Sequence, residues 1–264
     1  MMPYRTLTDQ MNRTITVPQI PQRIVSLVPS QTELLYDLGL DETVVGITKF
    51  CIHPDAWFRS KTRVGGTKQV HMDRVAALQP DLIIANKEEN MQPQVEALAQ
   101  KYPVWISDIH SLPQALDMIN RVGTLVGRPT EAQQMARRIG EGFAPLQPAA
   151  TPLRVAYFIW YRPWMSVGQD TFIADMLQRC GWINVFAGMN RYPEIDLAVL
   201  KAAAPDVVLL SSEPFPFKAK HVAELQAVLP AAKIILVDGE MFSWYGSRLL
   251  HAADYLQNLV NQLS

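Results

Sequence analysis

The amino-acid sequence predicts an α/β protein with two Rossmann-like lobes, mostly parallel sheets and a single long backbone helix that joins the lobes. Three observations predict this fold: segments that recur at offsets of about 130 residues, short apolar strands that alternate with helices, and one amphipathic helix between the two repeats. We expect an N-terminal lobe at residues 1–128, the linking helix at 129–147 and a C-terminal lobe at 148–264. Ligands of doubly wound folds bind beyond the carboxyl ends of the strands, so the ligand cleft should lie between the lobes.

The internal repeat consists of three segments that recur in the same order. The clearest of them combines a helix end, a Pro-Asp turn and a buried strand. The three pairs are residues 23–27 with 154–158, 76–86 with 202–212, and 103–108 with 234–238. Three ordered pairs are hard to obtain by chance, so they indicate two lobes of one architecture.

The linking helix is predicted at residues 130–144. Pro129 and Thr130 supply the turn and the N-cap, and Pro145 ends the helix. The spacing of its apolar residues places them on one face, which should be buried. These residues are Ala132, Met135, Ala136, Ile139 and Phe143.

The first lobe should begin with an edge strand at 13–17, which Pro18 and Pro21 close. Short apolar runs then alternate with helical segments, as in a parallel sheet covered on both faces. Ser30 or Thr32 should cap the first helix, which ends at Leu38. The further expected elements are strands at 24–28, 44–48, 82–85 and 104–107, and helices at 72–78, 92–100 and 112–126.

The second lobe should repeat this alternation. Its expected strands are 155–160, 207–210 and 234–237, and its expected helices are 171–180, 197–203, 221–228 and 248–263. The loops that follow the strands of both lobes should face the cleft. The longest of these loops are 49–66, 161–168, 211–216 and 238–247.

Composition and charge exclude several classes of function. A net charge of −1, with no basic run, argues against a nucleic-acid partner. No apolar stretch reaches the length of about 18 residues that a membrane span needs. The first twenty residues lack the apolar core of a secretory signal. Cys51 and Cys180 fall in different lobes, so we expect two thiols.

Aromatic residues are concentrated in the loops at the expected cleft. Aromatic faces with few charges suit a large, flat, partly apolar ligand held by stacking. No catalytic motif accompanies them, since the sequence has no G-x-S-x-G, Walker, G-x-G-x-x-G or H-E-x-x-H pattern. We therefore expect a binding protein without catalytic residues and without a cofactor or metal of its own. The alternative is an enzyme that processes a metal chelate with Cys51, His53 and the pair Glu88-Glu89. A third possibility is an interaction module that binds no ligand.

Four motifs carry a resemblance to a known family. They are RIVSLVPS-x-TE at 23–33, VGGT at 64–67, DRVAAL-x-PDL at 73–82 and the second Pro-Asp at 205–206. Together they resemble the class III substrate-binding proteins of ABC importers, the helical-backbone receptors for cobalamin, haem and ferric siderophores. The resemblance implies a small-molecule ligand, an ABC permease as partner and a periplasmic or other extracytoplasmic location. Because no signal peptide is visible, a cytoplasmic carrier stays an alternative. We also expect the protein to be a monomer.

The same resemblance assigns site residues one by one. Thr67 and Asn86 stand where the cobalamin receptors have tryptophans, and Trp244 replaces an arginine near the ligand. Other positions keep an aromatic ring: Phe50 in place of a tyrosine, Trp164 in place of a phenylalanine and Tyr192 in place of a tryptophan. The neighbouring loop residues Cys51, His53, Trp160, Phe242 and Tyr245 complete the predicted ligand site.

The family's docking residues are one acid in each lobe, placed to meet arginines of the permease. Asp73 matches the first acid, and the second position falls at Ala198, with Asp196 close by as the expected N-cap of its helix. We therefore expect a substrate-binding protein of an ABC-type importer that takes a corrinoid or another metal chelate. A ferric siderophore or haem receptor is the alternative ligand assignment.

Overall fold

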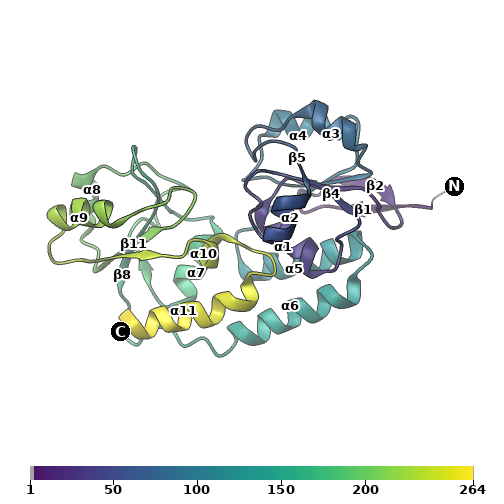
Figure 1. Cartoon of the computed structure of the whole chain (residues 1–264). Helices are drawn as coiled ribbons and strands as arrows, with labels where there is room; N and C mark the ends of the chain where they lie inside the picture. The colour runs from purple at the N-terminus through teal and green to yellow at the C-terminus, as the bar shows by residue number, and fades with distance from the viewer. Residues whose placement is uncertain (1–2, 264) are drawn as a thin grey trace. The chain divides into compact units, whose positions relative to one another are not determined.

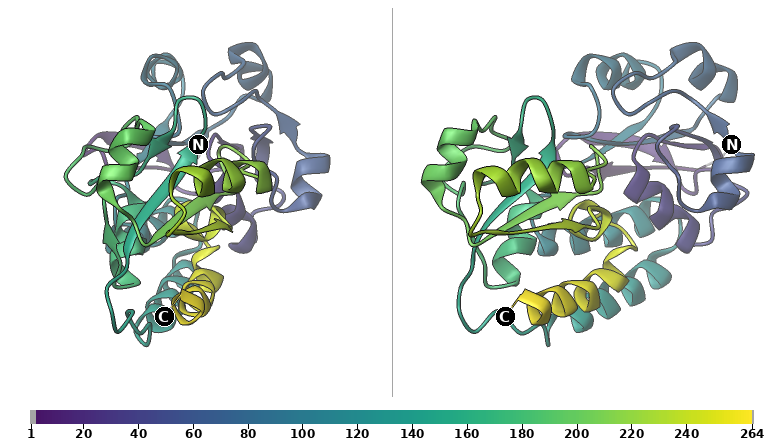
Figure 2. Two further views of the ribbon diagram at one scale, coloured as in Figure 1. Left: turned by 90° about the vertical axis from the view of Figure 1, so that its left-hand side faces the viewer. Right: turned by 60° about the vertical axis from the view of Figure 1, so that its left-hand side comes forward.

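The computed structural model describes residues 3–263 and divides into two compact units, which Figure 1 shows and Figure 2 shows from two further sides. Unit 1 comprises the chain up to Ile109 together with Pro113–Gly140 and Tyr245–Leu250. Unit 2 comprises His110–Leu112, Glu141–Trp244 and the chain from His251 onward. Each unit has its own parallel sheet, which confirms the predicted pair of α/β lobes. Within residues 3–263, no helix has both the length and the apolar character needed to cross a bilayer.

Unit 1 is built on a five-stranded parallel sheet with the order β5-β4-β3-β6-β7. Val75 of α3 and Val95 and Leu98 of α4 pack on one face of this sheet. The strands are β3 Ile24–Ser26, β4 Val44–Ile47, β5 Thr62–Arg63, β6 Leu82–Asn86 and β7 Val104–Ser107. The helices are α1 Pro29–Asp37, α2 Asp55–Ser60, α3 Met72–Leu78, α4 Gln92–Ala99 and α5 Leu112–Leu125.

Unit 2 is built on the parallel strand order β10-β8-β11-β12, with β9 antiparallel to β8. Leu200 of α8 and Leu225 of α9 belong to the same buried core as the strand residues Phe158 and Val208. The strands are β8 Arg154–Trp160, β9 Met165–Ser166, β10 Ile183–Asn184, β11 Val207–Ser211 and β12 Lys233–Val237. The helices are α7 Phe172–Arg179, α8 Leu197–Ala203, α9 Ala219–Val228, α10 Glu240–Ser243 and α11 Leu249–Leu263.

The two sheets confirm the repeat seen in the sequence. The three paired segments are β3, β6 and β7 in unit 1 and β8, β11 and β12 in unit 2, and each set is adjacent in the same order. The helices correspond as well, because α3 and α8 precede the second strand of each set and α4 and α9 follow it. The predicted helices 72–78 and 197–203 match α3 and α8 to the residue.

The linking helix is α6, Pro129–Phe143, and all five of its predicted core residues are buried. The helix ends at Phe143, earlier than the segment 129–147 that was expected for the link. The division between the two units falls inside α6, after Gly140. In unit 1, α6 lies very close to α5. A Cβ atom at Gly123 would lie 2.1 Å from the Cβ of Ala132, so only glycine permits this approach.

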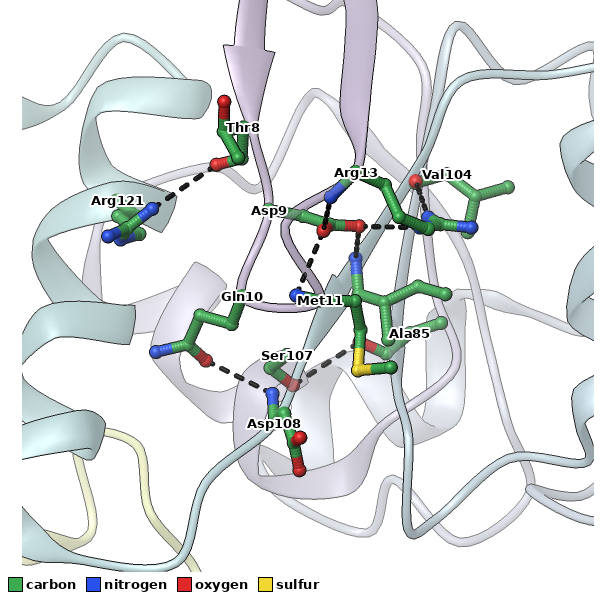
Figure 3. A network of polar contacts seen from close by, with 11 residues as sticks. Thr8, Asp9, Gln10, Met11, Arg13, Ala85, Val104, Ser107, Asp108 and Arg121 are labelled. Carbon is green, nitrogen blue, oxygen red and sulfur yellow. Dashed lines mark hydrogen bonds and ion pairs between the residues drawn. The ribbon is translucent and has the colours of Figure 1, made fainter.

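An N-terminal hairpin departs from the prediction. β2 (Thr14–Pro18) pairs with β1 (Tyr4–Thr8) in a separate two-stranded sheet, whereas an edge strand of the lobe was expected. Asp9 at the turn holds the hairpin in place, as Figure 3 shows. Its buried carboxylate accepts hydrogen bonds from the backbone N–H groups of Met11 and Arg13 and forms an ion pair with Nε of Arg13, each at 2.9 Å. Arg13 also donates to the carbonyl oxygen of Val104 in β7 at 2.7 Å.

Other departures are short elements inside predicted loops. The loop expected at 49–66 contains α2 and β5, the loop expected at 161–168 contains β9, and the loop expected at 238–247 contains α10. A further short strand, β10, follows α7. The predicted helix cap was wrong, because α1 begins at Pro29 with Val28 as its N-cap. Thr32 instead donates from its hydroxyl to the carbonyl oxygen of Val28 at 2.8 Å, inside the first turn. Proline fits the first turn because its missing N–H would have no helical partner there.

Candidate functional site

Unit 1 presents one large aromatic side chain to solvent after β4. Phe50 is 51% exposed, and the ammonium group of Lys49 lies 5.0 Å from the centre of its ring. Ile52 on the same loop is also exposed. A Cβ atom at Gly66 would lie 3.1 Å from the ring edge of Phe50, so the glycine leaves room for this ring position. Phe50 therefore offers an open aromatic face at the carboxyl end of the sheet.

Cys51 lies beneath that surface. Its Sγ atom contacts the hydroxyl oxygens of Thr32 at 3.1 Å and Thr48 at 3.2 Å, and burial raises the pKa of the thiol. Cys51 is therefore a neutral thiol with polar neighbours and lacks the thiolate that a nucleophile needs. His53, two residues later, is half-buried.

The cluster that the enzyme alternative requires, Cys51, His53, Glu88 and Glu89, is not assembled as a metal site. Among residues 3–263, no group of three or more His, Cys, Asp or Glu side chains is arranged to hold a metal ion. The two glutamates instead donate their backbone N–H groups to the side-chain oxygen of Asn86, at 2.8 Å and 2.9 Å. The turn at 86–90 is thus organised by hydrogen bonds between its backbone and the Asn86 side chain.

Asn86 and Thr67 are both buried in unit 1. The amide of Asn86 donates to the hydroxyl of Ser107 at 2.9 Å, so this side chain fixes the end of β6 against β7. The amide of Asn90 donates to the carbonyl oxygens of Thr67 at 3.0 Å and Leu27 at 3.2 Å. The two positions where the resemblance implies tryptophans therefore hold a threonine, whose backbone carbonyl accepts from Asn90, and an asparagine, whose side chain contacts β7.

Unit 2 contains an aromatic cluster at the carboxyl end of β8. We use this term for Trp160, Tyr161, Trp164, Phe215, Phe217 and His221, whose rings lie within 6 Å of at least one other member. Trp164 is only 8% exposed, and its ring stacks on Phe217 at 5.7 Å with an interplanar angle of 9°. Trp160 is 39% exposed and meets Phe215 edge-on at 5.8 Å. The exposed ring of the cluster is therefore Trp160, whereas Trp164 forms part of its interior.

The loop after β12 places its predicted site residues below the surface. Phe242 is fully buried and packs against the rings of Tyr157 at 5.0 Å and Tyr255 at 6.2 Å. Trp244 is 4% exposed and Tyr245 is similarly buried. Of the predicted ligand residues in unit 2, Trp160 and the half-buried Tyr192 are therefore the most accessible.

Glu213 is a residue of this region that the sequence did not indicate. One oxygen of its carboxylate, Oε1, accepts hydrogen bonds from the hydroxyl of Ser243 at 2.6 Å and from the indole N–H of Trp244 at 2.8 Å. Burial raises the pKa of Glu213, and the neighbouring Glu240 and Asp238 raise it further. A lone glutamate before a proline carries no recognisable pattern, so only the fold brings it to Trp244.

A pocket of about 440 Å³ lies elsewhere in unit 2. It is lined in part by His110, Asp170, Gln178, Trp182 and Ile183. None of the predicted ligand residues lines it, so it is separate from the loops described above.

The two candidate docking positions are equivalent in the structure. Asp73 is the second residue of α3 and Ala198 is the second residue of α8, and both are exposed. The helices end alike, with the left-handed residues Gln79 (φ 45°) and Ala204 (φ 43°). The expected N-cap is confirmed, because the carboxylate of Asp196 accepts from the backbone N–H of Val199 at 2.8 Å.

Comparison with known proteins agrees with this architecture. The family model described as "Periplasmic binding protein" matches residues 24–233. A vitamin B12-binding protein of Pectobacterium carotovorum is 27% identical over 257 residues, which cover 93% of this chain and 90% of that protein. The ABC transporter substrate-binding lipoprotein YvrC of Bacillus subtilis is 26% identical over 269 residues, which cover 95% and 83% of the two chains.

A solved structure is also similar to this chain. The periplasmic heme-binding protein BhuT, in complex with two hemes, is similar with a TM-score of 0.78 and 25% identity, and the match covers 92% of this chain and 99% of that one. The family match spans the parallel sheet of unit 1, the linking helix α6 and unit 2 as far as the start of β12. The chain belongs to the periplasmic binding protein family, the substrate-binding proteins of ABC-type importers.

Proposed function

We propose that this protein captures a corrinoid or another large metal chelate and delivers it to an ABC permease. The observation that carries the proposal is the exposed aromatic ring after a central strand of each sheet, Phe50 in unit 1 and Trp160 in unit 2. Exposed rings of this size are favourable sites for stacking on a broad conjugated or apolar ligand face. The relatives named for vitamin B12 and heme bind ligands of that kind.

The predicted ligand residues then divide into two groups by exposure. Phe50, Trp160, Tyr192 and His53 are accessible and would touch the ligand. The buried residues would support the loops that carry these contacts. They are Cys51, Thr67, Asn86, Trp164, Phe242, Trp244 and Tyr245.

A second ligand assignment, haem or a ferric siderophore, is favoured by the polar positions in unit 1. Neither Thr67 nor Asn86 has a ring that could stack on a corrinoid. Both residues are buried and hydrogen-bonded to the loops around them. The accessible His53 could in turn coordinate an iron centre through an imidazole nitrogen. The choice between the two assignments therefore depends on whether the ligand is held by stacking alone or also by coordination.

The test is a tryptophan-fluorescence titration with cyanocobalamin, hemin and ferrichrome on matched variants. Phe50→Ala and Trp160→Ala should each weaken binding of the preferred probe about tenfold or more, because each removes a stacking surface. Tyr4→Ala is the control, since Tyr4 is an exposed aromatic residue on the hairpin, away from the strand ends. Equal affinities for all three variants and the unaltered protein would contradict the proposed site.

The proposal includes a transporter partner, a monomeric state and action outside the cytoplasm. Asp73 on α3 would meet a basic residue of the permease, and α8 offers Ala198 and the capping carboxylate of Asp196 at the equivalent place.

Relatives named as binding proteins support a receptor without catalytic activity. Cobalt and iron spectra of the protein before and after Cys51→Ser test the enzyme alternative, which requires a metal–thiolate band that the variant loses.

A further inference from the structure

We infer that Glu213 is a positioning residue for ligand recognition, whose carboxylate fixes the Trp244 indole and α10 in the arrangement that binds the ligand. The inference rests on the proposed function, because Trp244 matters to recognition only if the loop after β12 belongs to the ligand site. Glu213 lies on a different loop, the one after β11, so the contact joins two neighbouring strand ends of unit 2.

The contact is specific because one carboxylate oxygen receives both donors. Ser243 is the last residue of α10 and Trp244 is its C-cap, so the two hydrogen bonds at 2.6 Å and 2.8 Å hold the end of that helix. The carbonyl oxygen of Gly239, 2.9 Å from the Ser243 hydroxyl, is a second acceptor within reach of the same proton. Hydrogen bonds to an ionised acceptor are stronger than neutral ones, so the indole orientation is strongly fixed.

The loop that carries Glu213 is itself held in place. The hydroxyl of Ser211 donates to the carbonyl oxygen of Glu213 at 2.6 Å, and the hydroxyl of Tyr157 donates to Ser211 at 3.1 Å. The backbone N–H of Gly239 donates to the hydroxyl of Ser212 at 2.9 Å. A Cβ atom at Gly239 would lie 2.2 Å from the Ser211 oxygen and 2.8 Å from Cγ of Glu213. The two loops therefore meet at a distance that only glycine allows.

The charge of Glu213 is costly for a purely structural contact. A neutral glutamine has an oxygen that could accept the same two hydrogen bonds, whereas a buried carboxylate carries a desolvation penalty. The acidic groups near it, Asp238 after β12 and Glu240 on α10, increase that cost, and the Tyr157 hydroxyl is a further neighbour. Because the pKa of Glu213 is raised, proton uptake as the pH falls should weaken the hold on Trp244.

The place of Trp244 in the chain gives this contact a functional consequence. Trp244 is the last residue of unit 2 before the segment Tyr245–Leu250, which belongs to unit 1. In unit 1, Arg248 is fixed in turn by Glu33 of α1, with Nη2 to Oε1 at 2.5 Å and Nε to Oε2 at 3.0 Å. An acid therefore fixes the chain on each side of the step from Trp244 to Tyr245, and Glu213 fixes the side that carries the candidate ligand residue Trp244.

The experiment uses four variants of the full chain. Glu213→Ala removes the acceptor, Glu213→Gln keeps an acceptor without the charge, and Trp244→Phe keeps a ring without the N–H. Glu224→Gln is the control, because Glu224 in the same unit also accepts a hydrogen bond, from the Tyr161 hydroxyl at 2.8 Å. The first measurement needs no ligand. The emission of Trp244 is the difference between the spectra of the unaltered protein and Trp244→Phe. When Glu213→Ala is introduced into both proteins, this difference emission should shift to longer wavelength.

The second measurement is the affinity for cyanocobalamin and hemin between pH 5 and pH 8. Glu213→Ala should weaken binding of the preferred probe about tenfold, and Glu213→Gln should lose the pH dependence with a smaller loss of affinity. Adding Trp244→Phe to Glu213→Ala should cause little further loss, since both changes break the same contact. Unchanged affinity in Glu213→Ala, or losses that simply add, would overturn the inference. If the unaltered protein binds neither probe, the proposed function fails, and an unshifted Trp244 emission then separately overturns the positioning role.

Discussion

The carboxylate of Asp81 accepts a hydrogen bond from the backbone N–H of Arg23 at 2.9 Å, and Asp206 accepts one from Arg154 at 2.8 Å. In each unit this contact joins the start of the second paired strand to the start of the first. The guanidinium of Arg23 also donates to the carbonyl oxygen of Leu78, at the end of α3, at 2.8 Å. The repeated Pro-Asp turn is therefore a repeated structural device that aligns helix, turn and strand.

Removing this carboxylate should destabilise each unit. Asp81→Ala should lower the free energy of unfolding by about 1–2 kcal/mol, because Asp81 also accepts from the backbone N–H of Gln22, and Asp206→Ala should cost about 1 kcal/mol. Urea unfolding followed by circular dichroism measures both. Asp73→Ala, at an exposed position of α3, is the control and should change stability little. A cost of Asp73→Ala equal to that of Asp81→Ala would count against this role of the turn.

Much of the fold was predictable because its signals are local. The apolar spacing of α6 and the ordered recurrence of β3, β6 and β7 can be read from short windows of sequence. The hairpin of β1 and β2 was missed because its position depends on the buried carboxylate of Asp9 and on contacts about ninety residues away, such as Arg13 with Val104. Local patterns carry no information about such contacts.

The exposed and buried tryptophans of the aromatic cluster should respond differently to truncation. Trp164→Ala removes a ring stacked in the interior and should lower the free energy of unfolding by about 3–5 kcal/mol. Trp160→Ala should cost about 1 kcal/mol, because that ring is partly exposed. Thermal unfolding of the two variants side by side checks this. Equal losses would show that Trp160 is also part of the interior.

Both cysteines should resist modification in the folded protein. Cys51 and Cys180 are buried free thiols, and burial raises the pKa of Cys180 to about 12. A disulfide reagent such as DTNB should therefore label neither thiol under native conditions and two thiols in guanidinium chloride. Rapid native labelling that disappears in Cys51→Ser would instead reveal a reactive thiol and revive the enzyme alternative.

His221 should make stability depend on pH. Burial lowers its pKa, and the nearby Lys220 lowers it further, so the folded state resists protonation. The unfolded chain binds the proton at about pH 6.5, so the free energy of unfolding should fall as the pH drops below that value. Urea unfolding between pH 5 and pH 8 measures the slope, which His221→Gln should reduce. His251→Gln, at an exposed position of α11, should leave it as it is, and a reversed order of the two effects would contradict the assignment.

The candidate site was harder to predict than the fold because exposure depends on packing. The sequence places Phe50, Trp164 and Phe242 alike in loops after strands. In the structure Phe50 is open, Trp164 is covered by Phe217, and Phe242 is buried against Tyr157. The direction in which a loop side chain points follows from long-range contacts, so an aromatic loop indicates a site without identifying the rings that form its surface.

A crystal structure of the protein with its preferred probe, cyanocobalamin or hemin, bound at saturation shows directly which side chains hold the chelate. We expect the chelate to stack on the exposed rings of Phe50 and Trp160. A chelate that leaves either ring uncovered, or one seated in the pocket beside Trp182, would contradict the proposed site.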